Sequence, residues 1–264
     1  HGQAEHFPED GKTSGDSITM ISIAIPAYGM NGLGAKFLTE MFDTIDNQTY
    51  RDVEVVVSDH SEDNNILDVC DKYSDIFPVT YIRNFYDRGN GPANTNTALK
   101  HCSGDLIKIM FQDDLFTDET ALEKIRDKFN ESQCAWVVTG FSHTSDGKNF
   151  YRPMVPRWSE HLLEGQNFMG GPSIVTLRRE CLEYFDSECK MLMDTEFYHR
   201  MRYFHGMPDI VDDICVCSRE GDHRISSNAE LDIICEHPDG SWQANSKELE
   251  YVTEKHKETR DYAE

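Results

Sequence analysis

The sequence predicts an α/β fold in which one mostly parallel sheet is flanked by helices within a single domain. Three features of residues 18–115 support this prediction. Near-continuous apolar runs are typical of buried strands, apolar residues at helical spacing lie between these runs, and polar residues follow each run directly. Strands and helices therefore alternate along the chain, and this alternation is typical of a parallel, doubly wound sheet.

The elements of this first half follow one another in a regular order. Four strands are expected in ITMISIAIPAY (18–28), VEVVVSDHSEDN (53–64), PVTYIRN (78–84) and DLIKIMF (105–111), with helices near 33–45, 66–73 and 91–102. In the fourth strand, Ile107, Ile109 and Phe111 alternate with Lys108 and Met110, which is the period of two that a strand requires.

The second half of the predicted domain, residues 116–228, is less regular. A helix is expected over 121–129, strands over 135–141 and 170–177, and a helix over 194–204 with Phe197, Met201 and Phe204 on one face. Residues 1–17 are predicted to be a flexible polar leader. Residues 229–264 are predicted to be an acidic C-terminal extension that forms a solvated helix or a loose tail.

The composition limits the partners that the chain can have. Its 264 residues include 48 acidic and 25 basic side chains, which give a formal charge of -23. This charge repels phosphate backbones and anionic lipid, so nucleic acid is not an expected partner. An acidic protein that handles an anionic substrate needs local positive charge, and a bound divalent cation would supply it.

The eight cysteines have neither the spacing of a disulfide scaffold nor that of paired zinc hooks. We expect them to be reduced and packed, as in a cytoplasmic protein. Cys215 and Cys217 would share one face of a strand. No apolar run approaches the ~18–20 residues that a membrane span requires, so no span is expected.

Polar residues collect where the predicted parallel strands end. In such sheets, ligands bind beyond the carboxyl ends of the strands. The alternative is that strand ends are exposed and therefore polar. The residues in question are Pro26, Ala27 and Tyr28 after the first strand, Asp59 after the second, Arg83 after the third, and Asp113 and Asp114 after the fourth.

The order and spacing of several motifs resemble those of family-2 glycosyltransferases, which have the GT-A fold and transfer sugars from nucleotide donors. ISIAIPAYG resembles the opening strand of that family, with Gly29 where Asn is usual, and VEVVVSDHSEDN resembles its second strand. GPANTNTALKHCSGDLI resembles its glycine loop and Asn-bearing helix, with Asn96 in the matching place. FQDDLF resembles its Asp-x-Asp variant. GGPSIVTLRREC, MDTEFYHRM and REGDHRISS resemble its later motifs, with Met193 in place of Glu.

The resemblance implies a donor site that contains a metal ion. Asp114 would bind Mn²⁺ or Mg²⁺, and Asp113 would contact the ribose or the sugar of the donor. The alternative for this pair is that it caps and opens a helix near Thr117. Hard oxygen ligands suit these ions, and the metal would stabilise the charge that develops on the leaving diphosphate.

The nucleotide would lie on the first three strand ends. Asp59 would accept a hydrogen bond from the N3–H of the base, which fits uracil or thymine and favours a UDP-sugar donor. The turn Pro26-Ala27-Tyr28 would pack on that base. Arg83 would reach a phosphate or Asp59, or would be an ordinary surface residue.

The acceptor hydroxyl, on a glycan or another molecule, must lose a proton as it attacks. Asp194 is the residue that the resemblance implies as the base, with an N-cap role as the alternative, and direct displacement by one base inverts the anomeric configuration. His223 would complete the metal shell or contact the diphosphate, and Arg224 would neutralise phosphate charge. The alternative for His223 is an exposed surface histidine.

Two other functions remain open at the level of the sequence. A sugar-phosphate nucleotidyltransferase also combines a nucleotide-binding α/β sheet with a metal, but IPAYGMNGLG has no Arg or Lys for a triphosphate. A catalytically inactive module that binds nucleotide sugars is the other alternative, since Gly29 and Met193 depart from the family pattern. The sugar, the acceptor and the oligomeric state are not specified by these motifs.

Overall fold

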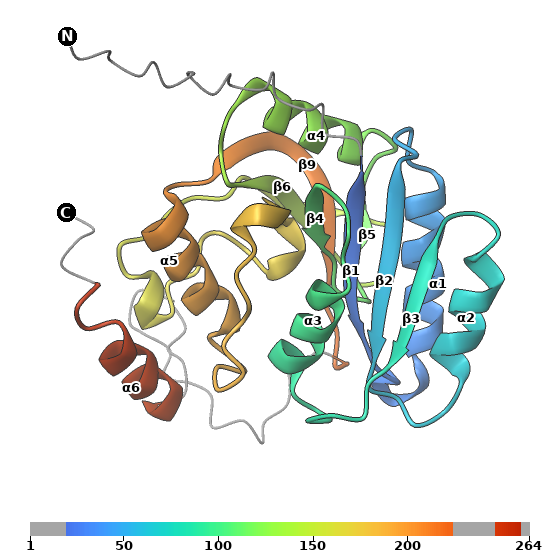
Figure 1. Cartoon of the computed structure of the whole chain (residues 1–264), viewed down its shortest axis with the longest axis horizontal. Coiled ribbons are helices and arrows are strands. Elements are labelled where there is room, and N and C mark those ends of the chain that lie inside the picture. Colours follow the sequence, from blue (N-terminus) through green and yellow to red (C-terminus); the bar gives the residue numbers. More distant parts are fainter. Residues whose placement is uncertain (1–19, 224–245, 260–264) are drawn as a thin grey trace, which may run out of the picture.

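One mixed sheet forms the centre of the protein, with the strand order β3-β2-β1-β4-β8-β6-β9-β5 and with β7 paired to β6. The structure is a computed structural model that describes residues 20–223 and 246–259 (Figure 1). The predicted α/β class is therefore confirmed. The predicted leader, residues 1–17, lies outside the described residues.

The helices and strands have the following bounds: β1 Ile21–Ala27, η1 Met30–Gly32, α1 Gly34–Asp46, β2 Val53–Asp59, α2 Asn65–Tyr73, β3 Val79–Arg83, α3 Gly91–Lys100, β4 Leu106–Ile109, β5 Leu115–Phe116, α4 Ala121–Glu131, β6 Trp136–Thr144, β7 Tyr151–Met154, η2 Leu162–Glu164, η3 Pro172–Ile174, β8 Val175–Arg178, η4 Arg179–Cys181, α5 Met193–His205, β9 Asp209–Arg219 and α6 Ser246–Lys255.

The first half of the chain builds a parallel sheet whose strand order reverses once, and we call the region beyond the carboxyl ends of β1 and β4 the crevice. Strands β1 to β4 are all parallel, and the chain moves outward from β1 to β2 to β3 before it returns to the other side of β1 as β4. Because such crossovers are right-handed, α1 and α2 lie on one face of the sheet and α3 on the other (Figure 1). The order reverses between β1 and β4, and ligands bind at the carboxyl ends beside such a reversal.

The second half continues the same sheet with mixed pairing. Strand β8 runs antiparallel to both β4 and β6, whereas β6 and β9 are parallel. The short strand β5 follows the turn after β4 and pairs antiparallel with β9. This pairing brings the end of β9 to the turn that contains Asp113 and Asp114.

The apolar runs of the sequence form the interior of the sheet. Ile23 and Ile25 of β1 and Val55 and Val57 of β2 are fully buried, as expected for central strands that are covered on both faces. In α1, the apolar side chains at helical spacing from Phe37 to Ile45 face the sheet and are buried. These layers hold the ends of the parallel strands in fixed positions.

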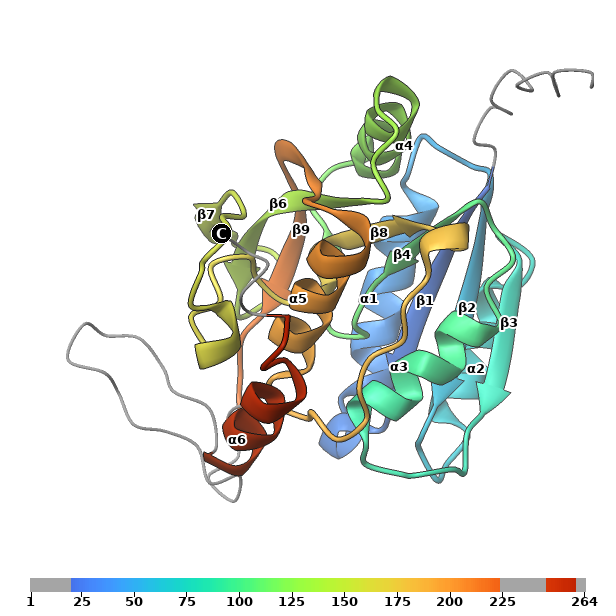
Figure 2. The ribbon, with the colours of Figure 1, turned by 60° about the vertical axis from the view of Figure 1, so that its left-hand side comes forward.

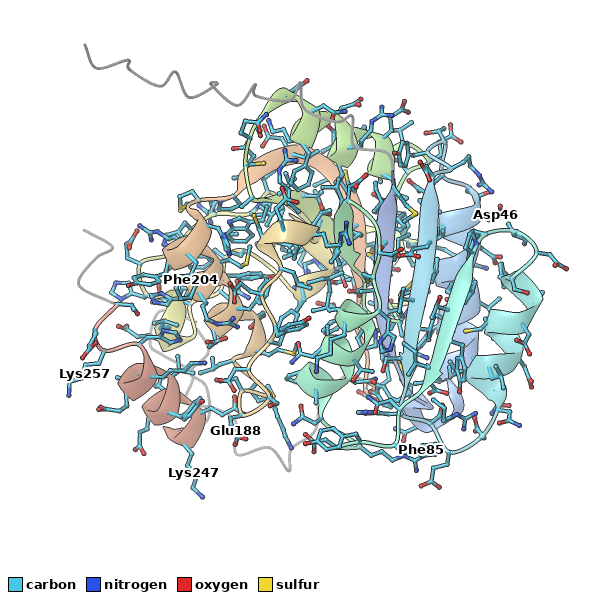
Figure 3. All side chains as sticks on the ribbon, in the orientation of Figure 1. Asp46, Phe85, Glu188, Phe204, Lys247 and Lys257 are labelled. Carbon is cyan, nitrogen blue, oxygen red and sulfur yellow. The ribbon has the colours of Figure 1, made fainter. Side chains whose placement is uncertain are left out.

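Two side chains of the predicted elements show a degree of burial that the sequence pattern did not specify. All four residues of β4 are buried, including Lys108 with 0% exposure, because β1 and β8 flank this strand and both of its faces are covered. Phe204 is 59% exposed, whereas Phe197 and Met201 are fully buried. Phe204 lies in the last turn of α5, where its ring contacts Tyr203 rather than the core (Figure 3).

The predicted C-terminal extension differs from a solvated helix or loose tail. Part of it, residues 229–245 and 260–264, lies outside the described residues, but α6 packs beside α5 (Figure 2). Val252 and His256 are buried there. The seven cysteines in the described ranges are free, as expected, and Cys215 and Cys217 are both buried in β9. Among the described helices, none has the length and apolar character needed to cross a membrane.

Candidate active site

A buried glutamine joins the turns that follow β1 and β4. Gln112 accepts a hydrogen bond from the backbone N–H of Tyr28 at 2.8 Å and donates one to the carbonyl of Gly34 at 2.8 Å. Gly34 has no room for a side chain, since an added Cβ would lie 2.2 Å from the carbonyl oxygen of Tyr28. The predicted turn Pro26-Ala27-Tyr28 is therefore held directly beside the aspartate pair.

Asp59 is fully buried, and both of its carboxylate oxygens accept hydrogen bonds from the protein. One oxygen accepts the backbone N–H of Ser61 at 2.8 Å, and the other accepts the hydroxyl of Tyr81 at 2.7 Å. A nucleotide base would have to share one of these oxygens with its protein donor. The contact between Asp59 and a base stays a prediction.

Arg83 lies against Asp59 rather than free on the surface. Its Nε is 3.8 Å from the carboxylate of Asp59 and donates to the hydroxyl of Tyr81 at 2.6 Å. Its other donors reach the carbonyl of Glu62 at 3.3 Å and the side chain of Asn64 at 2.8 Å. The proximity to Asp59 agrees with one of the two predicted contacts, and the contact with a phosphate stays a prediction.

The asparagines of α3 have different roles. Both groups of the Asn96 amide bind the backbone of Phe185, at 2.7 and 2.8 Å, and so connect α3 to the second half of the domain. Asn94 instead donates to the carbonyl of Ala27 at 3.1 Å and accepts from Ser58 at 2.6 Å. Asn94 therefore supports the strand ends, which the motif comparison missed. A signal was present, since it is a polar residue one helical turn from the loop that opens α3.

The aspartate pair lies in the turn between β4 and β5 and is almost fully buried. Asp114 accepts the backbone N–H of Arg219 at 3.0 Å, and Arg219 donates its Nε to the carbonyl of Asp113 at 3.0 Å. The predicted alternative, a cap for a helix near Thr117, is wrong because α4 begins at Ala121 after the cap residue Thr120. The pair therefore belongs to the crevice and not to a helix end.

Arg219 was missed in the sequence because an arginine at a strand end is not distinctive. It is 2% exposed, its guanidinium lies 4.4 Å from the ring centroid of Phe37, and it forms an ion pair with Glu40. Its position follows from the pairing of β9 with β5, which was not predicted. Arg219 thus binds the turn of the aspartate pair to α1.

His223 is in contact with the aspartate pair, and the alternative of an exposed histidine is wrong. Its Nε2 lies 3.0 Å from a carboxylate oxygen of Asp113, and its ring lies 4.8 Å from that of Phe37. The hydroxyl of Tyr28 donates to the backbone carbonyl of His223 at 3.2 Å. Burial and the nearby charge of Asp113 raise the pKa of Tyr28, so this hydroxyl keeps its proton. Arg224 lies outside the described residues.

Asp194 is the second residue of α5, so it lies inside the first turn and is not the N-cap, which is Leu192. One of its oxygens accepts the side-chain N–H of Asn167 at 2.8 Å, and the carboxylate remains partly exposed. Glu196 is the other acid in the first turn of α5. It is fully buried and accepts hydrogen bonds from Arg200 and other donors, which leaves Asp194 as the accessible carboxylate at this helix start.

The donor groups fit a divalent cation whose shell is completed by a substrate. Within residues 20–223 and 246–259, no three His, Cys, Asp or Glu side chains are grouped closely enough to enclose an ion. Mg²⁺ and Mn²⁺ are commonly held by one or two carboxylates together with substrate phosphates, so a complete protein cage is not required. The buried pair Asp113 and Asp114 could supply one or two carboxylates to such an ion, and Nε2 of His223 lies beside the pair, at 3.0 Å from Asp113.

The fold and this arrangement define a class of nucleotide-sugar transferases, and the comparisons agree with it. The family model for glycosyl transferase family 2 matches residues 22–220, so the chain belongs to this family. Its class is therefore that of a glycosyltransferase and not of a nucleotidyltransferase.

Individual proteins of known function or structure are also similar to this chain. Glycosyltransferase GlyG of Streptococcus pneumoniae serotype 4 (strain ATCC BAA-334 / TIGR4) is 25% identical over 134 residues, which cover 50% of this chain and 42% of that protein. The structure of S. aureus TarS 1-349 in complex with UDP-GlcNAc is 20% identical with a TM-score of 0.63, covering 79% of this chain and 61% of the other. Mannosyltransferase PcManGT from Pyrobaculum calidifontis, in complex with GDP-Man and Mn2+, is 19% identical with a TM-score of 0.55, over 78% and 57%. The chain thus spans less than two thirds of each of these proteins, and the solved structures confirm the GT-A fold.

Proposed function

We propose that this protein transfers a sugar from a UDP-sugar to a hydroxyl group of a glycan or another acceptor, with inversion at the anomeric carbon and with Mn²⁺ or Mg²⁺ as the cofactor. The observation that carries the proposal is the meeting of Tyr28, Asp113 and His223 at the reversal point of the sheet, within the residues matched by the family model. The UDP and UDP-GlcNAc complexes of TarS support uracil as the base of the donor.

Different residues of the crevice contact different parts of the donor. The turn ending in Tyr28 packs against the base, and Asp59 accepts its N3–H. Asp113 faces the ribose or the sugar, whereas Asp114 and His223 hold the metal. When bound, the metal supplies the positive charge that the leaving diphosphate needs. The motif resemblance also implies that Asn96 and Arg224 contact the donor. Arg224 is proposed as a phosphate contact, whereas both groups of the Asn96 amide bind the backbone of Phe185.

Asp194 acts as the base for the acceptor hydroxyl. Its position in the first turn of α5 and its bond from Asn167 keep the carboxylate oriented and partly exposed. A single base acting opposite the leaving group gives one displacement and therefore inversion. The cytoplasmic location expected from the cysteine spacing stays a prediction.

Release of UDP from a panel of UDP-sugars, measured with Mn²⁺ and after chelation by EDTA, tests this function. We expect metal-dependent release by the native protein and a loss of ~10²–10⁴-fold in Asp194→Asn, because the amide keeps the shape but cannot take the proton. The affinity for UDP should be unchanged in that variant. Asp194→Asn with native turnover would exclude this base, and no turnover by the native protein with any donor would favour the inactive binding module.

Calorimetric titration of UDP in the presence of Mn²⁺ tests the metal assignment. Asp114→Ala should abolish the metal-dependent part of the affinity, and Asp113→Ala should weaken it less. The matched control is Asp118→Ala. Asp118 lies just outside the turn of the aspartate pair and forms an ion pair with Lys124. Native affinity in Asp114→Ala would refute Asp114 as the ligand.

A further inference from the structure

Helix α6 lies outside the residues matched by the family model, yet it packs on the part of the domain that carries Asp194. The family match ends at residue 220, whereas α6 begins at Ser246. Val252 is fully buried and forms a small separate apolar cluster with Leu163, Cys189 and Leu192. Leu192 is the residue directly before α5, so α6 contacts the chain at the point where it enters that helix (Figure 2).

One side chain of α6 binds three successive backbone N–H groups of this entry segment. The carboxylate of Glu248 accepts hydrogen bonds from Lys190 at 3.0 Å, Met191 at 2.9 Å and Leu192 at 3.0 Å. Leu192 itself offers no side-chain cap to α5. Successive N–H groups form a concave site for an anion, and a carboxylate near a helix N-terminus is favoured by the helix dipole. Glu248 therefore holds the backbone of residues 190–192 through a side chain that comes from another helix.

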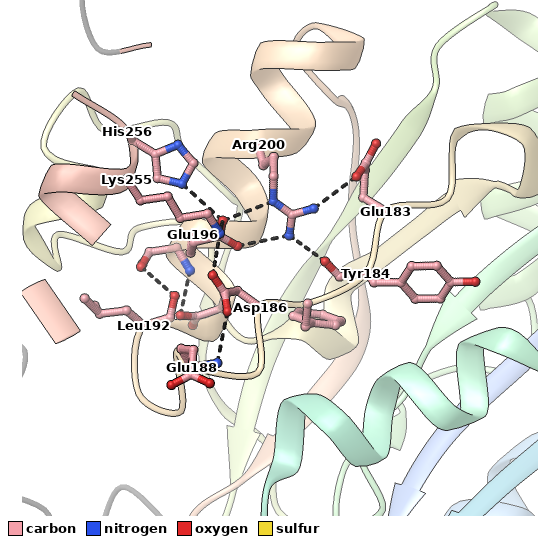
Figure 4. Close-up of polar contacts among 12 residues, drawn as sticks. Glu183, Tyr184, Asp186, Glu188, Leu192, Glu196, Arg200, Lys255 and His256 are labelled. Atoms are coloured by element: carbon pink, nitrogen blue, oxygen red, sulfur yellow. Dashed lines mark hydrogen bonds and ion pairs between the residues drawn. The ribbon is translucent and has the colours of Figure 1, made fainter. Parts of the chain in front are cut away.

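A second set of contacts fixes α6 to the body of α5. Glu196 is fully buried, and its carboxylate accepts a hydrogen bond from Nζ of Lys255 at 2.7 Å and lies 3.1 Å from Nε2 of His256 (Figure 4). Arg200, which is also in α5, donates a hydrogen bond to the same carboxylate. Burial alone would raise the pKa of Glu196, but the hydrogen bonds from His256 and Arg200 hold it well below its ordinary value. The carboxylate is therefore charged, and its bonds to α6 are charge-assisted.

The loop that leads to α5 is also bound to α6. Asp186 accepts the hydroxyl of Tyr251 at 2.8 Å and forms an ion pair with Lys255. Contacts from α6 therefore reach residue 186, residues 190–192 and residue 196, which lie on both sides of Asp194. A segment held at both ends by the same helix has little freedom to shift.

We propose that α6 is a positioning element for the proposed base and that Glu248 is its main positioning residue. Glu248 would not touch the substrate; it fixes the backbone two residues before Asp194 and so sets where that carboxylate faces the acceptor. This inference rests on the proposed function, in which Asp194 is the base. A misplacement of about 1 Å in such a group can reduce a rate by ~10²-fold, so the contact matters for turnover far more than for donor binding.

The test compares Glu248→Ala with Glu250→Ala. Glu250 lies on the same helix, is exposed, and has no hydrogen bond or ion pair to the described residues, so its replacement removes the same charge without the contact. Hydrogen exchange measured by mass spectrometry should show at least ~10-fold faster exchange over 186–195 in Glu248→Ala and native protection in Glu250→Ala. Strands β1 to β4 should keep native protection in both variants.

Kinetics separate positioning from simple support of the fold. In Glu248→Ala, UDP release from a UDP-sugar should fall by ~10–100-fold, while the Kd for UDP with Mn²⁺ changes by less than about twofold. Glu248→Gln keeps one acceptor oxygen and should recover part of the rate. When Glu248→Ala is added to Asp194→Asn, the rate should not fall further, because Glu248 affects the rate only by positioning the base that Asp194→Asn has already removed.

The outcomes distinguish this inference from the function on which it rests. Native exchange over 186–195 in Glu248→Ala would overturn the inference whatever the rate, and so would a turnover equal to that of Glu250→Ala. Full turnover in Asp194→Asn would instead refute the proposed base. In that case the exchange result still decides whether α6 holds this segment, since exchange does not depend on which residue takes the proton.

Discussion

The buried lysine of β4 gives the sharpest prediction about stability. Lys108 is 0% exposed, and its side-chain amino group donates a hydrogen bond to the carbonyl of Ser173. Burial lowers its pKa from 10.5 to about 7, although Cys215 and Asp114 act in the opposite direction. We predict that Lys108→Met makes the protein more stable at pH 7 but less stable above pH 10.

The magnitude follows from the two pKa values. Between pH 7 and pH 10.5 the unfolded chain holds the proton on Lys108 and the folded chain does not, so the free energy of unfolding rises with pH. At ~1.4 kcal/mol per pH unit, the native protein has roughly 5 kcal/mol less stability from this group at pH 7 than at pH 10.5. The methionine variant avoids that loss but leaves the carbonyl of Ser173 without its donor, at a cost of ~1–3 kcal/mol. The variant should therefore gain about 2–4 kcal/mol at pH 7 and lose about 1–3 kcal/mol above pH 10.

Urea denaturation followed by circular dichroism at pH 7, 8.5 and 10, in a reducing buffer, measures this difference. The control is Lys148→Met, because Lys148 is exposed and its side chain forms no hydrogen bond or ion pair with the described residues. This variant should keep the pH dependence of the native protein. The reasoning is wrong if Lys108→Met is destabilised equally at all three pH values, or if its stability rises with pH as steeply as that of the native protein.

Two further predictions concern contacts near the crevice and α6. Gly34→Ala should reduce the free energy of unfolding by about 1–3 kcal/mol or more, because the added Cβ would lie 2.2 Å from the carbonyl oxygen of Tyr28. The control is Gly29→Ala, which should be nearly neutral because an added Cβ there has nothing within 4 Å. Equal urea midpoints for the two variants would contradict the prediction. Glu196→Gln should flatten the acid limb of stability below pH 4.5. The native carboxylate has a lowered pKa, so its contribution is present above that pH and is lost as pH falls; an unchanged limb in urea titrations from pH 6 to 3 would refute it.

The sequence was sufficient for the parts of the fold that follow from local pattern. Runs such as Ile21–Ala27 and Val53–Asp59 have apolar residues at most successive positions, and such runs are typical of strands covered on both faces. With four such strands and helices between them, right-handed connections allow few arrangements, so the crevice at the end of β1 and β4 could be predicted. His223 was predicted to complete the metal shell beside Asp114 or to contact the diphosphate, whereas its contact with Asp113 was not predicted.

Long-range pairing explains what the sequence did not reveal. Arg219 reaches the aspartate turn because β9 pairs with β5, and no local pattern specifies that pairing. The same is true of Glu248, whose three bonds join residues more than 50 positions apart. An acidic, polar helix has the composition of a solvated one, but α6 is anchored to the domain through the buried side chain of Val252 and through charges that are paired. Composition cannot distinguish a paired charge from a solvated charge.

The charges of the crevice are compatible with the proposed divalent cation. Arg219 is a buried arginine at the aspartate turn. Its guanidinium forms an ion pair with Glu40, and it contacts the turn through its backbone N–H to Asp114 and through its Nε to the carbonyl of Asp113. Burial of both Asp113 and Asp114 is costly while they are ionised, and this cost grows when a diphosphate approaches in a chain of charge -23. A divalent cation would offset the two carboxylates and attract the diphosphate at once. If the site works in this way, binding of Mn²⁺ alone should raise the thermal midpoint of the native protein more than that of Asp114→Ala, before any nucleotide is added.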